Sequence, residues 1–155
     1  MNPALAILFA VSSAAAPSDW QEHRSGVEFS IGQVVGHDVT EYRVRSFAPT
    51  SGRFSTVAEF SATNMGDTWI GYGLAQTFPV ANGLSIGLTF VPGLYIQGEG
   101  PDLGGVLNFR SGVELIYSTD RVTISIGYDH RSHAGINGGF NPGLDTIFVS
   151  GRIDF

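Results

Sequence analysis

Hydrophobic residues alternate with polar or small residues along most of the chain from Val27 to Phe155. A period of two is typical of a β-strand with one apolar face, because successive side chains point to opposite sides of a strand. Segments rich in turn-forming residues interrupt the alternation. The alternating segments are 27–31, 42–45, 54–60, 70–74, 84–90, 107–115, 122–129 and 147–155. We therefore predict eight strands and an all-β fold.

The second face of these strands indicates which kind of barrel they form. A soluble barrel would carry many solvating lysine and glutamate residues there, whereas this face is mainly glycine, serine and threonine. Its few charges have both signs and could neutralise one another inside a narrow lumen: Glu28, Glu41, Arg43, Arg45, Glu59, Arg110, Glu114, Asp129, Arg152 and Asp154. We therefore predict an eight-stranded antiparallel up-and-down outer-membrane β-barrel, apolar outside and polar inside. Side chains fill a lumen of this size, so no transport pore is expected.

The connections between the strands predict the topology. With an even strand number and both ends in the periplasm, the short segments 48–52, 79–83 and 118–120 are expected as periplasmic turns. The longer segments 92–104 and 133–144 are expected as outer loops. Phe155 ends an alternating strand, as does the terminal aromatic that the barrel-insertion machinery recognises in outer-membrane proteins. The predicted location is thus a Gram-negative outer membrane, which the chain crosses many times.

The first sixteen residues differ from the rest of the chain. An apolar run over 4–11 is followed by Ser-Ser-Ala-Ala-Ala at 12–16, a small-residue cleavage pattern. A run of eight residues is too short to span a bilayer as a helix. We predict a signal peptide over 1–16, although its first three residues lack positive charge, and one barrel domain over 17–155.

Composition narrows the partners and the chemistry. The chain has 8 basic and 14 acidic residues and a net charge of −6, which argues against a nucleic-acid partner. It has no cysteine, which excludes disulfides, zinc thiolate sites and cysteine nucleophiles. No cluster of carboxylates indicates a catalytic cation, so neither a metal nor another cofactor is expected. The 21 glycines are scattered, which suits a tightly curved sheet.

Three polar residues are predicted to share one outward face at the outer end of the last two strands. The apolar alternation of 122–128 continues in step to His130 and Ser132, and counting back from Phe155 reaches Asp145 on the same face. Residues directly opposite in an antiparallel pair have Cβ atoms about 4.5–5.5 Å apart, so Asp145 can contact His130. A serine nucleophile needs a base, and the base needs an orienting acid. Ser132, His130 and Asp145 fit these roles.

The same region resembles a known family. Tyr-Asp-His-Arg-Ser-His-Ala-Gly at 128–135, Asn-Pro-Gly-Leu-Asp at 141–145 and a last strand ending in Phe155 are similar to the lipid A 3-O-deacylases of the PagL type. The resemblance implies an eight-stranded barrel whose lipid-facing Ser-His-acid triad removes the acyl chain ester-linked at position 3 of lipid A. It assigns His130 as the base, Ser132 as the nucleophile, Asp145 as the acid and Asn141 as an oxyanion-binding side chain.

The resemblance also implies partners and two departures. Lipid A or lipopolysaccharide is the expected substrate, outer-membrane lipids surround the barrel, and a homodimer is left open. Backbone N–H groups near Ala134 and Gly135 are expected to help Asn141 bind the oxyanion. His133 stands where the family usually has Asn, and Asp145 where it usually has Glu, one methylene longer.

Two other functions fit parts of the pattern. A non-enzymatic outer-membrane barrel with a structural or adhesive role would make His130 and Ser132 incidental, and a secreted soluble barrel could bind a small ligand. Outside the candidate triad, Trp20 and Trp69 are expected as anchors at the membrane interface. His23 and His37 are expected as surface histidines, and Arg131 points inward by parity.

Overall fold

The computed structural model describes residues 25–120 and 122–155. The predicted signal peptide over 1–16, Trp20 and His23 lie outside the described residues. Among the described residues there is no helix long and apolar enough to cross a membrane.

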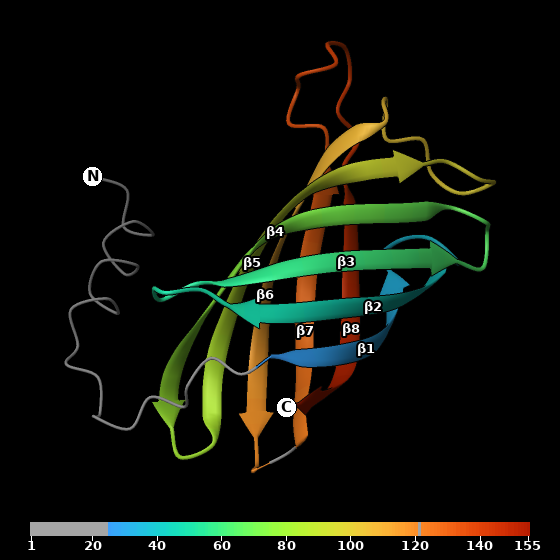
Figure 1. Ribbon diagram of the computed structural model, residues 1–155. Coiled ribbons are helices and arrows are strands. Elements are labelled where there is room, and N and C mark those ends of the chain that lie inside the picture. The colour runs from blue at the N-terminus through green and yellow to red at the C-terminus, as the bar shows by residue number, and fades with distance from the viewer. Residues whose placement is uncertain (1–24, 121) are drawn as a thin grey trace.

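The described residues form eight antiparallel strands in a closed barrel (Figure 1). Each strand pairs with the next one along the chain, and β8 pairs with β1, so the all-β, eight-stranded up-and-down prediction is confirmed. Every predicted segment falls in one strand, apart from Phe54 and Phe155 at segment ends. The strands are β1 (Gly26–Val34), β2 (Thr40–Pro49), β3 (Ser55–Thr63), β4 (Thr68–Ala81), β5 (Leu84–Ile96), β6 (Leu107–Ser118), β7 (Val122–Ser132) and β8 (Leu144–Asp154).

The two ends of the barrel differ in their connections. Figure 1 shows the β7–β8 loop, in orange and red, at one end and the C-terminus at the other. We call the end with the β5–β6 loop (97–106) and the β7–β8 loop (133–143) the long-loop end. The predicted loop 92–104 begins too early, because β5 continues to Ile96. Beyond Pro92 the alternation persists, with Tyr95 buried in the lumen and Leu94 and Ile96 exposed outside.

The outer wall of the barrel is apolar, as predicted. Every strand directs large hydrophobic side chains outward, where they are exposed, as at Phe29, Ile70 and Val149. The charged partners on the alternate positions are buried inside, among them Glu28, Arg45 and Glu114. This is the reverse of a soluble barrel, and it is the pattern of a barrel whose outside meets lipid.

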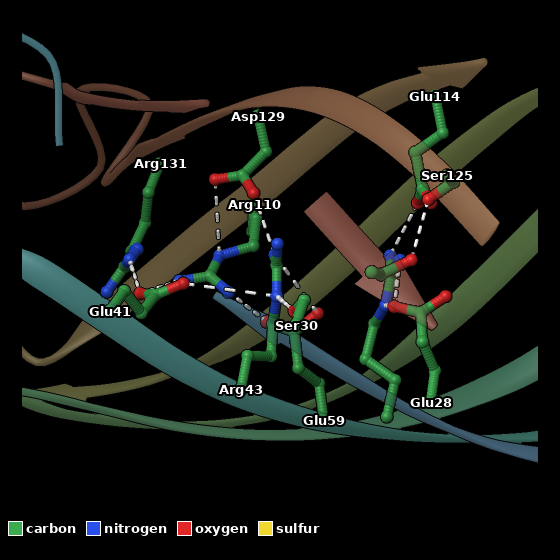
Figure 2. Close-up of polar contacts among 12 residues, drawn as sticks. Glu28, Ser30, Glu41, Arg43, Glu59, Arg110, Glu114, Ser125, Asp129 and Arg131 are labelled. Atoms are coloured by element: carbon green, nitrogen blue, oxygen red, sulfur yellow. Dashed lines mark hydrogen bonds and ion pairs between the residues drawn. The ribbon is translucent and has the colours of Figure 1, made fainter. Parts of the chain in front are cut away.

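Arg110 is the centre of the larger ion-pair group in the lumen (Figure 2). Its guanidinium donates to Glu41 at 2.6 Å and to Glu59. Its Nε also lies 3.6 Å from Asp129. Arg131 donates to the same oxygen of Glu41 at 2.5 Å. Buried charges need such partners, because an unpaired charge in a low-dielectric interior is strongly destabilising.

The remaining lumenal arginines complete this neutralisation. Arg43 donates to Asp129 at 2.7 Å. Arg45 lies deeper toward the other end of the barrel and pairs with Glu28 at 2.5 Å and Glu114 at 2.6 Å. The predicted mutual neutralisation of lumenal charges is thus confirmed, and the space between the strands is occupied by paired side chains.

Trp69 closes the lumen toward the long-loop end and does not anchor at an interface. It is 1% exposed, and the guanidinium groups of Arg110 and Arg131 lie 5.2 and 5.3 Å from its ring centre. Successive residues of a strand point to opposite sides, so Trp69 points inward beside outward Ile70, and the predicted interfacial anchor is wrong. Gly93 leaves room for the indole, since a Cβ there would lie 2.6 Å from the Trp69 ring. The buried side chains of Tyr95, Leu103 and Leu144 belong to the same core.

Replacing Arg110 by methionine tests whether the lumenal ion pairs stabilise the barrel. Arg110→Met leaves Glu59 without its closest partner and removes one of the two arginines that donate to Glu41, so it should lower the free energy of unfolding by about 3–5 kcal/mol. Urea titration in detergent micelles, followed by the mobility difference between heated and unheated samples on a denaturing gel, measures the change. Arg53→Met is the control, because Arg53 is exposed in the β2–β3 turn. Equal urea midpoints for the two variants would contradict the prediction.

Candidate functional site

The β7–β8 hairpin brings His130 and Asp145 together. The two residues are directly opposite in the antiparallel register, and Nδ1 of His130 lies 2.8 Å from Oδ1 of Asp145. Their side chains are 45% and 41% exposed on the outward side of the wall. A carboxylate accepts a hydrogen bond from an Nδ1–H, which leaves Nε2 of a neutral imidazole as a free base. The predicted contact between these two residues is therefore present.

Tyr128 is part of this site, and the sequence reasoning missed it. Its hydroxyl donates to Oδ1 of Asp145 at 2.7 Å, the same oxygen that faces His130. The signal was available, since Tyr128 precedes His130 by two residues and shares its outward parity. The backbone carbonyl of Asp145 also accepts a hydrogen bond from the N–H of Val35 at 2.8 Å. Both the backbone and the side chain of Asp145 are thus held.

Ser132 is the last residue of β7 and has outward parity. It lies opposite Phe109 of β6, and it is only 8% exposed. The Phe109 ring stacks on exposed Phe90, with ring centres 5.9 Å apart. No described residue forms a hydrogen bond with the Ser132 hydroxyl, so the histidine and the acid are paired while the serine is not.

The β7–β8 loop positions Asn141. The backbone N–H of His133 donates to Oδ1 of Asn141 at 3.2 Å. The amide oxygen accepts this bond, and the amide NH₂ forms no hydrogen bond with a described residue, so the NH₂ is available as a donor. Ala134 has a φ of 50°, the sole positive value for a non-glycine residue in the described part of the chain. Such strained backbone often marks a functional loop.

The family resemblance predicts asparagine at position 133. His133 is instead a buried residue that contacts the backbone of this loop at two places. Its side chain is fully buried, with Nε2 3.3 Å from the carbonyl oxygen of Phe140. Its Nδ1 accepts the N–H of Gly135 at 3.1 Å. That N–H is therefore not free to bind an oxyanion, contrary to the expectation for Gly135. The backbone N–H of Ala134 forms no hydrogen bond with any described residue.

Gly143 brings the end of the loop against the imidazole of His130. Its φ is +66°, in the left-handed region that side chains other than glycine rarely adopt. A Cβ at this position would lie 2.6 Å from Cε1 of His130. Glycine is thus required here both by the backbone conformation and by the space that the imidazole occupies.

The neighbouring charged and titratable residues have other roles. Arg131, between His130 and Ser132, points into the lumen and is bound to Glu41, as its parity predicted. His37 is exposed, as expected of a surface histidine. The described ranges contain no group of three or more His, Cys, Asp or Glu residues that could hold a metal ion.

Comparisons with known proteins bear on the family and on the fold. A family model described as lipid A 3-O-deacylase (PagL) matches residues 16–153. The crystal structure of the outer membrane enzyme PagL is similar with a TM-score of 0.67 and 15% sequence identity, covering 84% of this chain and 99% of that chain. No curated protein sequence matches the chain.

Two further structures show the same architecture. One comes from the de novo design of transmembrane β-barrels and has a TM-score of 0.67 at 9% identity, covering 88% of this chain and 99% of its own. The other is the N-terminal β-barrel domain of Pseudomonas aeruginosa OprF, with a TM-score of 0.66 at 10% identity, covering 86% of this chain and 98% of its own. At such identities the structural likeness shows the fold alone.

Replacing Gly143 by alanine should displace the His130 imidazole and break its hydrogen bond with Asp145. In Gly143→Ala, labelled with ¹⁵N in the histidine rings and observed by ¹H–¹⁵N NMR in detergent micelles, the hydrogen-bonded Nδ1–H signal of His130 should be lost. Gly139→Ala is the matched control, because Gly139 lies in the same loop with a φ of +72° and has nothing within 4 Å of its Cβ position. Backbone strain of about 1–2 kcal/mol is common to both variants. An unchanged signal in Gly143→Ala would show that the imidazole does not depend on this glycine.

Proposed function

Because the chain belongs to the lipid A 3-O-deacylase (PagL) family, we propose that it is an outer-membrane esterase that removes the acyl chain ester-linked at position 3 of lipid A. The hydrogen bond between His130 and Asp145 on the outward face carries this proposal. His130 and Asp145 form a base–acid pair on the outward side of the wall, and Ser132 has the same outward parity. The hydrogen-bond donors of the β7–β8 loop lie at the same end of the barrel. This combination supports serine ester hydrolysis.

The position of the site suits a lipid substrate. The wall below it is apolar, and the long loops above it are polar or small at most positions. In an outer membrane the site would lie where acyl chains meet the sugar headgroup, which is where the ester at position 3 is found. A catalytic group in the lumen could not contact that ester, because the closed wall of strands separates the lumen from the lipid.

The first half of the reaction is acyl transfer to Ser132. As substrate binds, Oγ of Ser132 attacks the ester carbonyl and Nε2 of His130 accepts its proton. Asp145 stabilises the imidazolium ion through the Nδ1–H hydrogen bond. The carbonyl oxygen becomes an oxyanion, and the side-chain NH₂ of Asn141 and the N–H of Ala134 are the donors available to it. One such donor typically contributes about 10²–10³-fold in rate.

The second half regenerates the enzyme. The tetrahedral intermediate collapses, the C–O bond to the sugar breaks, and the sugar hydroxyl leaves with the proton held by His130. Water then attacks the acyl-serine ester with His130 as the base, and the fatty acid is released. No step requires a metal ion or an oxidant.

The apolar surface beside Ser132 supports binding of the acyl chain. Phe109 is opposite Ser132 in the register, and Phe90 extends the surface along the outer wall. An acyl chain that contacts these rings exchanges contact with lipid for contact with protein, so the surface orients the chain more than it adds affinity. Orientation of the ester toward Ser132 lowers the entropic part of the barrier.

The shorter acid of this chain is compatible with the mechanism. Asp145 is one methylene shorter than the glutamate of the family pattern, yet its Oδ1 lies 2.8 Å from Nδ1 of His130. Direct opposition in the β7–β8 register supplies the proximity. The acid is therefore expected to orient the imidazole as the longer side chain would.

Replacing Ser132 by alanine should abolish deacylation and leave the barrel folded. The expected loss of turnover is about 10³-fold or more, because removal of the nucleophile leaves only binding and oxyanion stabilisation. Mass spectrometry of lipid A from cells that express each variant measures the missing acyl chain. Ser111→Ala is the matched control, since Ser111 is exposed on the same face and lies directly opposite His130. Retained activity in Ser132→Ala would exclude Ser132 as the nucleophile.

Replacing Asp145 by asparagine should lower turnover by less than the loss of Ser132 does. The amide keeps the size of the side chain but cannot stabilise the imidazolium by charge, and the acid is often the least costly triad member to remove. Asp145→Glu should retain activity, because it keeps the charge. Initial rates of fatty-acid release in mixed micelles measure both variants. Full activity of Asp145→Asn beside an inactive Ser132→Ala would mean that the site works as a dyad.

A further inference from the structure

Two donors converge on a single oxygen of the candidate catalytic acid. Oδ1 of Asp145 accepts the Tyr128 hydroxyl at 2.7 Å and faces Nδ1 of His130 at 2.8 Å. Within residues 25–120 and 122–155, these are the hydrogen bonds that the carboxylate makes. The Tyr128 hydroxyl forms no hydrogen bond with the proposed nucleophile or the proposed base among the described residues, but it shares the acid with the base.

The strand register explains this convergence. His130 is directly opposite Asp145, and Tyr128 is directly opposite Ile147, so Tyr128 and Asp145 are diagonal neighbours. A diagonal pair in an antiparallel sheet is about 7–8 Å apart, which an aromatic side chain can span. Because all three polar side chains project outward, the phenol approaches the carboxylate along the wall from the side away from the loop.

We propose that Tyr128 is a positioning residue of this esterase, whose hydroxyl holds the Asp145 carboxylate in the rotamer that presents Oδ1 to His130. This inference rests on the proposed function, and it assigns the hydroxyl a role that the aromatic ring alone would not have. A tyrosine at this level of a barrel wall can also act as an interfacial anchor through its ring. The two roles are separable, because phenylalanine keeps the ring and lacks the hydroxyl.

The exposure of Asp145 gives the hydroxyl its importance. The carboxylate side chain is 41% exposed, so without a fixed donor water would compete for its oxygens and other χ1 rotamers would be accessible. The backbone is already fixed by the register and by Val35, which leaves χ1 and χ2 as the remaining freedom. A hydrogen bond to a charged acceptor is among the stronger ones in proteins. Tyr128 therefore acts on the orientation of the base, which affects turnover and not substrate binding.

The first test compares two tyrosines at the same depth of the barrel. Tyr128→Phe should lower kcat about tenfold, as expected for losing a hydrogen bond to a charged group, with KM within about twofold of the wild type. Tyr72→Phe is the control, since Tyr72 is an exposed outward residue and the fifth residue from the long-loop end of β4, as Tyr128 is in β7. It should leave both constants unchanged. The heat-dependent gel shift should be the same in all three proteins.

A double-mutant cycle then tests whether Tyr128 acts through Asp145. In the Asp145→Ala background, Tyr128→Phe should change kcat by less than about twofold, because the acceptor of the hydroxyl is already gone. The same tenfold loss in both backgrounds would overturn the proposal. A rise in KM at constant kcat in Tyr128→Phe would also overturn it, because it would mean that the hydroxyl binds substrate. The Nδ1–H signal of His130 in ¹H–¹⁵N NMR gives an independent readout and should shift or broaden in Tyr128→Phe but not in Tyr72→Phe.

Ser132→Ala, measured in parallel, separates this inference from the proposed function. If Ser132→Ala is inactive and Tyr128→Phe has wild-type kcat, the positioning role is wrong and the esterase mechanism stands. If Ser132→Ala remains active, the proposed nucleophile is wrong and the kinetic effect of Tyr128→Phe cannot belong to this triad. The positioning role of Tyr128 is then wrong as well.

Discussion

Closure of the sheet is the constraint on which the other features of this molecule depend. A sheet surrounded by hydrocarbon has no water to bind its backbone groups, and pairing β8 with β1 leaves no free edge. Eight strands enclose a lumen that side chains fill. The charged residues on the inward positions are therefore forced into contact, and they are stable there only as pairs. The outward positions face lipid. An enzyme of this shape could therefore act on a membrane substrate only at its outer wall.

The lumenal ion pairs also support the outward site. His130 lies in the chain between Asp129, which is bound to Arg43, and Arg131, which is bound to Glu41. Both neighbours are buried, so the backbone that carries the imidazole is held from inside the barrel. Alternation along β7 thus connects the ion-paired interior to a candidate catalytic side chain on the wall. Precise placement of catalytic groups depends on such support from surrounding residues.

Hydrogen bonds hold only part of the candidate site on the outer wall. Asp145, the candidate acid, is held by its place in β8, by Val35 and by Tyr128. In the β7–β8 loop, the backbone N–H of the buried His133 donates to the side-chain oxygen of Asn141, and the side-chain NH₂ of Asn141 has no partner among the described residues. Ser132, in contrast, has no hydrogen bond to the base and is largely covered. These hydrogen bonds thus fix the candidate acid and the loop, and they do not include the proposed nucleophile.

Several features followed from the sequence alone, because they depend only on the period of a strand and on counting. The alternation determined the number of strands, the side of the wall on which each residue lies and the opposition of His130 and Asp145. The same alternation implies an inward Trp69, so the expectation of an interfacial anchor is wrong. Only the tertiary structure decided that Tyr128 shares the acid, that His133 is buried under the β5–β6 loop near Gly104, and that Ser132 is covered. These contacts depend on diagonal neighbours, side-chain rotamers and loop conformation, and no period in the chain encodes where two side chains from different strands or loops converge.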